Sequence, residues 1–190
     1  LSEQGDFTKA EGNFFRVLTA FSKQGNRWGL CSILLQIAEL HRLVGHLKEA
    51  RAMLAEARRY AEELDIHSLR ACCATEEARI VREEAAGASA GAAGNEGIEG
   101  AVKLLEEAMS LAEKCDNAEL TGEVHYEMGE TMVRLRRLRE APQYYKTAEE
   151  KVREVVENLP EEFRGSYAAR QKLRFRDWKA PTKLAKDPSR

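Results

Sequence analysis

A spacing of apolar residues recurs along the chain at intervals of 40 or 51 residues. At Ala50 a small residue is followed by the large Leu54 four residues later and by the small Ala57 seven residues later. Three other triplets share this spacing: Ala10, Phe14 and Val17; Ala101, Leu105 and Ala108; Ala141, Tyr145 and Ala148. Residues four and seven apart lie on one face of an α-helix, so each triplet predicts a helix with one closely packed face.

The four triplets begin 40, 51 and 40 residues apart, so the middle interval is 11 residues too long. The excess lies in the stretch AAGASAGAAGNEG, residues 85–97. A segment of glycine, alanine and serine offers few side chains to a core, and we predict a mobile loop there.

Another small residue lies twelve positions before each of the last three triplets: Ala38, Ala78 after allowing for the insert, and Gly129. Small residues on two neighbouring helices allow close approach, with the large residue of the triplet filling the remaining space. The pattern therefore predicts helix hairpins. Gly5 and Gly45 each lie five residues before a triplet and fit a tight turn between two helices, where a left-handed conformation is needed.

The repeat divides the chain into predicted units. Residues 1–24 form half a repeat, with one helix over 6–24, and the missing first helix indicates a fragment of a longer protein. Three full repeats follow: 25–64 (helices 26–44 and 47–64), 65–115 (helices 66–85 and 98–114, with the insert at 85–97) and 116–158 (helices 117–136 and 139–157). A capping helix is expected over 159–178, with Phe163 and Tyr167 covering the end of the last repeat, and a basic tail over 179–190.

This pattern of a small residue on the first helix and a small–large–small triplet on the second resembles the tetratricopeptide repeat family. The resemblance covers most of residues 5–158, although the period of 40 exceeds the usual 34 or so. It is similar to the long-period arrays of bacterial signalling and regulatory proteins. The resemblance implies an all-α fold, an α-solenoid of antiparallel hairpins; HEAT-type repeats are the rival architecture.

Composition agrees with an all-α chain that stays out of membranes. Alanine, glutamate, leucine and arginine dominate, and these residues favour helices. No apolar run reaches the roughly 18 residues that a membrane span needs. The four cysteines show no paired spacing, which favours reduced, buried thiols in a cytoplasmic protein.

No motif in the sequence indicates an enzyme. Metalloprotease, serine-hydrolase and phosphate-loop motifs are absent from the sequence, and its four histidines show no metal-ligand spacing. We therefore expect no catalytic residues, no metal and no cofactor.

The tetratricopeptide resemblance implies instead that the first helices of the repeats line a concave groove that binds a protein or peptide. Eight candidate residues carry over: Leu35, Glu39, Arg42, Arg79, Arg82, Tyr126, Glu130 and Arg134. The same spacing adds Ser32, Leu43, Cys72, Thr75, Glu83, Glu123 and Val133. Arginines and a tyrosine on such a surface would suit a partner with carboxylates and one apolar anchor. The alternative is that the arginines pair with Glu39, Glu83 and Glu130 and only solubilise this face.

The sequence therefore predicts a protein–protein interaction scaffold, the regulatory part of a larger protein. Self-association into a homodimer through an exposed repeat end is the second hypothesis. The third is nucleic-acid contact through the C-terminal segment: residues 164–190 hold nine Lys/Arg against two Asp/Glu, interleaved with Phe175 and Trp178. We favour a capping role over nucleic-acid binding for that segment.

Overall fold

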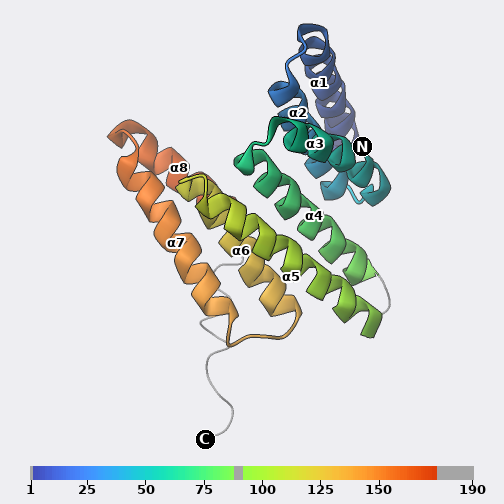
Figure 1. Cartoon of the computed structure of the whole chain (residues 1–190). Coiled ribbons are helices and arrows are strands. Elements are labelled where there is room, and N and C mark those ends of the chain that lie inside the picture. Colours follow the sequence, from blue (N-terminus) through green and yellow to red (C-terminus); the bar gives the residue numbers. More distant parts are fainter. Residues whose placement is uncertain (1, 88–91, 175–190) are drawn as a thin grey trace, which may run out of the picture. The chain divides into compact units, whose positions relative to one another are not determined.

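The computed structural model describes residues 2–87 and 92–174 of the chain. These residues form helices and contain no strand, which confirms the all-α fold class. The helices are α1 (Ser2–Gln24), α2 (Arg27–Leu43), α3 (Leu47–Leu64), α4 (His67–Gly87), α5 (Ala92–Glu113), α6 (Ala118–Arg134), α7 (Ala141–Asn158) and α8 (Glu161–Arg174) (Figure 1).

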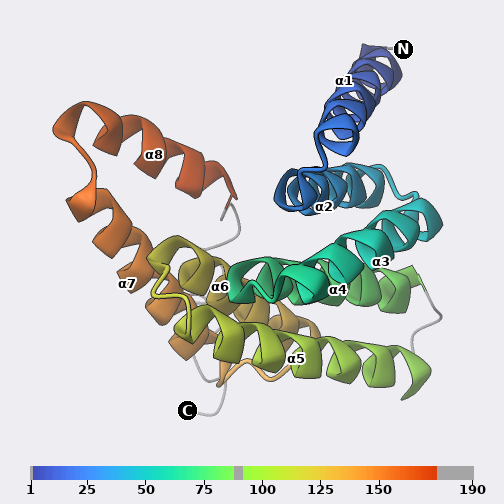
Figure 2. The same ribbon diagram turned by 45° about the horizontal axis from the view of Figure 1, so that its top comes forward.

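The chain divides into two compact units, residues 1–111 and 112–190. In the first unit α2 packs against α1, α3 and α4, and α3 also packs against α4. Both ribbon views place α3 beside α4 (Figures 1 and 2). Buried Leu34, Ala38, Leu54 and Ile80 belong to one core cluster contributed by α2, α3 and α4.

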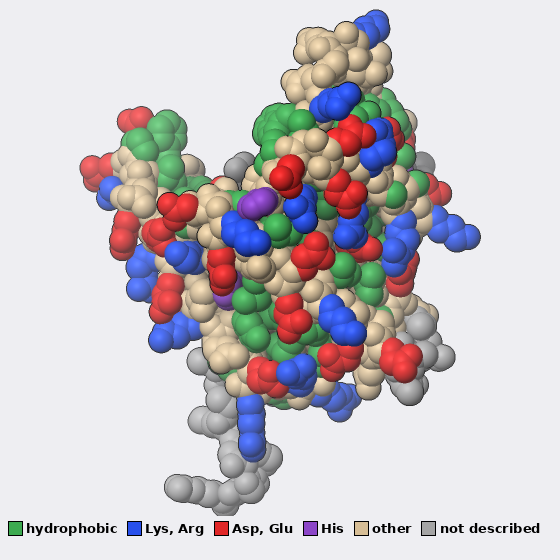
Figure 3. Space-filling view, in the orientation of Figure 1, with side chains coloured by type: hydrophobic (Ala, Val, Ile, Leu, Met, Phe, Trp, Pro, Cys, Tyr) green, Lys and Arg blue, Asp and Glu red, His purple; other side chains and the backbone are tan. Residues whose placement is uncertain are grey.

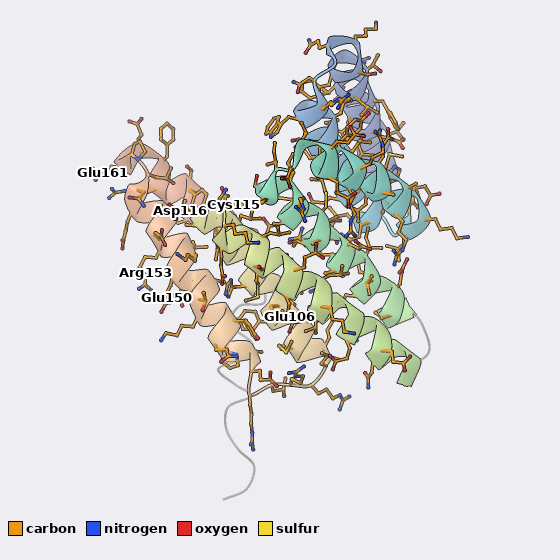
Figure 4. The ribbon with its side chains drawn as sticks, in the orientation of Figure 1. Glu106, Cys115, Asp116, Glu150, Arg153 and Glu161 are labelled. Atoms are coloured by element: carbon orange, nitrogen blue, oxygen red, sulfur yellow. The ribbon has the colours of Figure 1, made fainter. Side chains whose placement is uncertain are left out.

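The second unit is built on the hairpin of α6 and α7, against which α8 packs through α7. Gly129 of α6 lies so close to the ring of Tyr145 on α7 that an added Cβ would stand 2.7 Å from a ring carbon. Charged residues occupy the outer side of α7, where Figure 4 labels Glu150 and Arg153, both exposed. The hairpin thus buries small and aromatic residues between its helices and presents charges to solvent.

The small–large–small triplets form packed faces on three helices. The triplets of α3, α5 and α7 are buried throughout, as the hairpin pattern predicts. On α1 the equivalent face is different: Ala10 and Phe14 are half-buried and Val17 is exposed.

The turns repeat with the same register as the helices. Gly45 lies in the turn after α2 and has φ +81°. Arg136, 91 residues later in the sequence, lies in the turn after α6 and has φ +59°. Asn26 and Asn117 are also 91 residues apart, and each side-chain oxygen accepts a hydrogen bond from the first turn of the helix that follows, Gly29 N at 2.9 Å and Leu120 N at 3.0 Å. These caps satisfy backbone N–H groups that a helix start leaves free.

Three local expectations need correction. Gly5 is not in a turn but inside α1, because the chain simply continues as helix there. The loop expected over 85–97 is shorter than predicted: residues 85–87 end α4 and 92–97 begin α5, since alanine favours helix over loop, and residues 88–91 lie outside the described residues. Phe163 does not cover the end of the repeats; it is 53% exposed on α8, and only Tyr167 is half-buried.

Candidate binding surface

The eight predicted groove residues belong to both units and are described within each. Leu35, Glu39 and Arg42 lie on α2, and Arg79 and Arg82 lie on α4, all in the first unit. Tyr126, Glu130 and Arg134 lie on α6 in the second unit.

Arg42 joins α2 to α4 through a buried ion network. Its Nε donates a hydrogen bond to Glu76 Oε1 at 2.6 Å, and its Nη1 donates to Glu83 Oε1 at 2.7 Å. Glu39, one turn back on α2, lies 4.0 Å from Arg42 Nη2. The sequence alternative paired the arginines with Glu39, Glu83 and Glu130 at helical spacing. It did not foresee the bonds from Arg42 to Glu76 and Glu83, because both follow from the packing of α2 on α4.

Glu76 is the centre of this network. Arg79 Nη1 donates to its other oxygen at 3.1 Å, so two guanidinium groups hold one buried carboxylate. Burial raises the pKa of the Glu76 carboxyl, and the charges of Arg79 and Arg42 oppose that rise. Arg82, on the same helix, is buried as well. A partner could reach these arginines only by displacing internal contacts.

In the second unit two of the three candidates on α6 contact Tyr145 of α7. The rings of Tyr126 and Tyr145 lie 5.7 Å apart, and the Tyr145 hydroxyl donates to Glu130 Oε1 at 2.6 Å. Tyr126 is buried and Glu130 half-buried, whereas Arg134 at the end of α6 is exposed. The main role of Tyr126 and Glu130 is therefore to stabilise the hairpin.

The open part of the predicted face on α2 combines apolar side chains with Glu39, whose side chain is 47% exposed. Leu43 is 67% exposed, Leu35 is half-buried, and Trp28 is 56% exposed. Spacings of seven and eight residues bring Trp28, Leu35 and Leu43 to one side of the helix, and we call them the α2 stripe. Figure 3 shows hydrophobic side chains gathered over the region of α1 and α2.

Sequence reasoning missed Trp28, although its position seven residues before Leu35 was a usable signal. Contiguous exposed apolar residues on a folded domain mark interaction sites more often than isolated ones do. Tryptophan is also the residue most enriched at the energetic centres of interfaces.

Metal binding, disulfide formation and membrane insertion each place requirements on the described residues. Over residues 2–87 and 92–174 no group of three or more His, Cys, Asp or Glu could hold a metal ion. None of the four cysteines, all of which lie in the described ranges, forms a disulfide bond, and the buried Cys31 thiol donates to the Ala57 carbonyl at 3.2 Å. No described helix combines the length and apolar character needed to cross a membrane.

Comparison with models of known protein families finds no match, and a search of curated protein sequences likewise finds no significant relative.

Proposed function

We propose that this chain is a protein-interaction module of the tetratricopeptide type, an α-solenoid that binds a polypeptide segment along the α2 stripe. The observation that carries the proposal is the exposure of Leu43, which the sequence places among the groove residues, and of Trp28 on the same side of α2. A soluble domain gains nothing in its own stability from leaving such side chains in water, and burying them against a partner is favourable by about 25 cal/mol per Å².

The partner chemistry follows from what is open on this face. Because Arg42 and Arg79 are held by Glu76, apolar side chains rather than carboxylates are the expected anchors of the partner. Glu39 keeps 47% of its side chain exposed beside the α2 stripe, and it would favour a lysine or arginine flanking those anchors. We infer an extended or helical peptide with two large apolar residues and a basic neighbour. A module of this kind, with free thiols, suits a reducing cytoplasm.

Selection from a random peptide display library against the 190-residue protein tests this proposal. Binding of the selected peptides, measured by fluorescence anisotropy, should weaken at least about tenfold with Trp28→Ala and with Leu43→Glu, because truncating an interface anchor costs more than about 1.4 kcal/mol. Both side chains are exposed, so neither change should disturb the helix.

Phe163→Ser is the matched control, since it removes an exposed aromatic side chain from a different helix. Selected peptides that bind all four proteins equally would contradict the α2 stripe as the binding surface. Arg79→Glu is not a suitable test variant, because it would break a buried ion network and a loss of binding could then come from unfolding.

Nucleic-acid contact stays a separate hypothesis, and residues 175–190, on which it mainly depends, lie outside the described part of the chain. Binding of a single-stranded oligonucleotide that falls steeply with salt and disappears on deletion of 175–190 would support it.

A further inference from the structure

The turn between α6 and α7 has the backbone of the turn between α2 and α3 but carries more positive charge (Figure 1). At the offset of 91 residues Gly45 is equivalent to Arg136, and the backbone N–H of each donates to the carbonyl three residues earlier, at 2.9 and 3.0 Å. The two turns have the sequences LVGHLK, residues 43–48, and RLRRLR, residues 134–139. Three positions that hold leucine, glycine and histidine in the first turn therefore hold arginine in the second.

Arg136 occupies its position at a conformational disadvantage. Its φ of +59° lies in the left-handed region, where a Cβ crowds the backbone and which glycine enters without that cost. The other described residues with positive φ are glycines and aspartates, and aspartate tolerates this region better than most residues do. Glycine, as at Gly45, makes the same backbone hydrogen bond without strain. An arginine held in such a conformation points to a function of its side chain.

The arginines of this turn are open to a ligand. Arg134, Arg136, Arg137 and Arg139 are all exposed. Arg137 shows how such a side chain holds an anion, because its Nε and Nη2 donate to the two carboxylate oxygens of Glu140, each at 2.8 Å. Within the described residues no acidic side chain pairs with Arg136 or Arg139. Their guanidinium groups therefore offer planar sets of N–H donors to an anion from outside.

The positive charge is confined to the turn. Residues 118–133 of α6 hold four glutamates and no Lys or Arg, and α7 holds four glutamates against three Lys/Arg. A nucleic acid or an anionic membrane presents negative charge over an extended surface, which would also meet these glutamates. The C-terminal segment of this chain has the wrong charge for the turn, since residues 164–190 hold nine Lys/Arg against two Asp/Glu.

A phosphorylated side chain has the charge and the size that this turn requires. It brings about two negative charges and three acceptor oxygens to one point, and clusters of arginine are the usual means of binding it. Leu138, which lies between Arg137 and Arg139 in the sequence, is 39% exposed. It offers an apolar contact that a residue beside the phosphate on a peptide can use and a free phosphate ion cannot.

We propose that the α6–α7 turn, residues 134–139, binds a phosphorylated serine or threonine of a partner protein, with the phosphate on Arg136 and Arg139 and a neighbouring apolar side chain on Leu138. Binding at this turn then depends on prior phosphorylation of the partner. The site lies in the second unit, and its existence does not depend on the function proposed for the α2 stripe.

A peptide array tests this proposal. Each random sequence is present once with a central phosphoserine and once with serine, and the 190-residue protein is the probe. The phosphopeptides that bind best are labelled with fluorescein, and their dissociation constants are measured by anisotropy. Each should bind at least about tenfold more tightly than its serine form, because a serine hydroxyl cannot occupy two guanidinium groups.

Arg136→Gly separates binding from folding. It should weaken phosphopeptide binding at least about tenfold, yet it should raise the midpoint of urea unfolding, because glycine relieves the left-handed strain. Arg139→Gln should weaken binding to a similar extent without that gain. Arg153→Gln is the matched control, since 62% of the Arg153 side chain is exposed on α7 of the same unit, and it should leave binding unchanged. Leu43→Glu on the α2 stripe should also leave it unchanged.

Equal affinity for the phosphoserine and serine forms would overturn the site, and so would equal binding by Arg136→Gly and the unchanged protein. A loss with Arg153→Gln as large as that with Arg136→Gly would contradict it as well, because the attraction would then come from the charge of the whole unit.

The same proteins are titrated with a labelled single-stranded oligonucleotide and with vesicles of phosphatidylserine and phosphatidylcholine. The proposal expects both to bind more weakly than the best phosphopeptide. If either binds more tightly and loses this binding with Arg136→Gly, the turn recognises an extended anionic surface and the phosphopeptide proposal is wrong.

Discussion

Arg42 illustrates how a residue that sequence assigns to a binding face can instead stabilise the fold. Its guanidinium group lies between α2 and α4 and holds Glu76 and Glu83. Removing one member of a buried ion pair leaves a charge without compensation, and this is more costly than removing both members. The network should therefore appear in measurements of stability before it appears in measurements of binding.

We predict that Arg42→Gln lowers the free energy of unfolding by about 3 kcal/mol, because buried Glu76 loses one of its two guanidinium partners and Glu83 loses its bond to Arg42. The double variant Arg42→Gln/Glu76→Gln should lose clearly less than the two single variants added together. Urea unfolding followed by circular dichroism measures all four proteins. Strict additivity of the two single effects would show that the pair is not energetically coupled.

Gly129 is the residue on which the α6–α7 hairpin depends most closely. Its neighbour Tyr145 is held on one side by the Tyr126 ring and at its hydroxyl by Glu130, so the ring has little freedom to move away from a methyl group. We predict that Gly129→Ala destabilises the protein by about 1–2 kcal/mol, despite the higher helix propensity of alanine.

The same substitution at Gly12 is the control for Gly129. Gly12 lies inside α1 with no atom within 4 Å of an added Cβ, so Gly12→Ala should stabilise the protein by up to about 1 kcal/mol. Shifts of the urea midpoint in opposite directions confirm the packing argument. A stabilising effect of both changes would mean that the Tyr145 ring adapts without cost.

At the scale of the helices, a bidentate pair ties α3 to α4. Arg51 Nε donates to Glu84 Oε1 at 2.7 Å and Arg51 Nη2 donates to Oε2 at 2.5 Å. This hydrogen bonding lowers the pKa of Glu84, and burial opposes the shift only in part. A carboxyl whose pKa is lowered by folding stabilises the protein above its unfolded pKa, and this contribution is lost as the pH falls through the folded value.

We predict that Arg51→Gln costs about 0.5 kcal/mol at pH 7, since both side chains are more than a third exposed and the pair is screened by solvent. Near pH 3 the difference between the variant and the original protein should shrink. Thermal unfolding at the two pH values measures this difference. Lys48→Gln is the control, because it removes an exposed charge from the same helix and should show no such pH dependence. If Arg51→Gln lowers the stability equally at both pH values, the ion pair is not the cause.

The helices were largely predictable because their apolar spacing is periodic and strong. The bounds predicted for α3, 47–64, are those observed, and those of α2 and α6 differ by one or two residues at each end. The loop predicted over 85–97 was wrong at both of its ends. Glycine suggested a loop there, but residues 85–87 belong to α4 and residues 92–97 belong to α5. Alanine has no large side chain to reveal a buried face, so periodicity gives no signal in such a segment.

The candidate site was harder to predict, because exposure depends on neighbours that are distant in sequence. Register placed Arg42 and Leu43 on the same side of α2, yet Arg42 is buried by contacts with α4 and Leu43 is 67% exposed. Tyr126 was placed on an open face but packs on Tyr145. Helical spacing gives the direction of a side chain, whereas the packing of the next helix decides whether that direction is open.

For the whole molecule, the division into residues 1–111 and 112–190 predicts that a destabilising substitution raises hydrogen exchange mainly in the unit that carries it. Arg42 is on α2 and the hydrogen-bond partners described for it are on α4, whereas the contacts described for Gly129 and Tyr145 are on α6 and α7. Hydrogen exchange measured by mass spectrometry should therefore rise in α2 and α4 for Arg42→Gln, and in α6 and α7 for Gly129→Ala.

Each variant serves as the control for the other in this experiment, because the two substitutions lie in different units and both are expected to lower stability. Faster exchange confined to the unit that carries the substitution would mean that each unit opens on its own. Equal acceleration in both units for either variant would contradict this prediction and would mean that the two units unfold as one cooperative body.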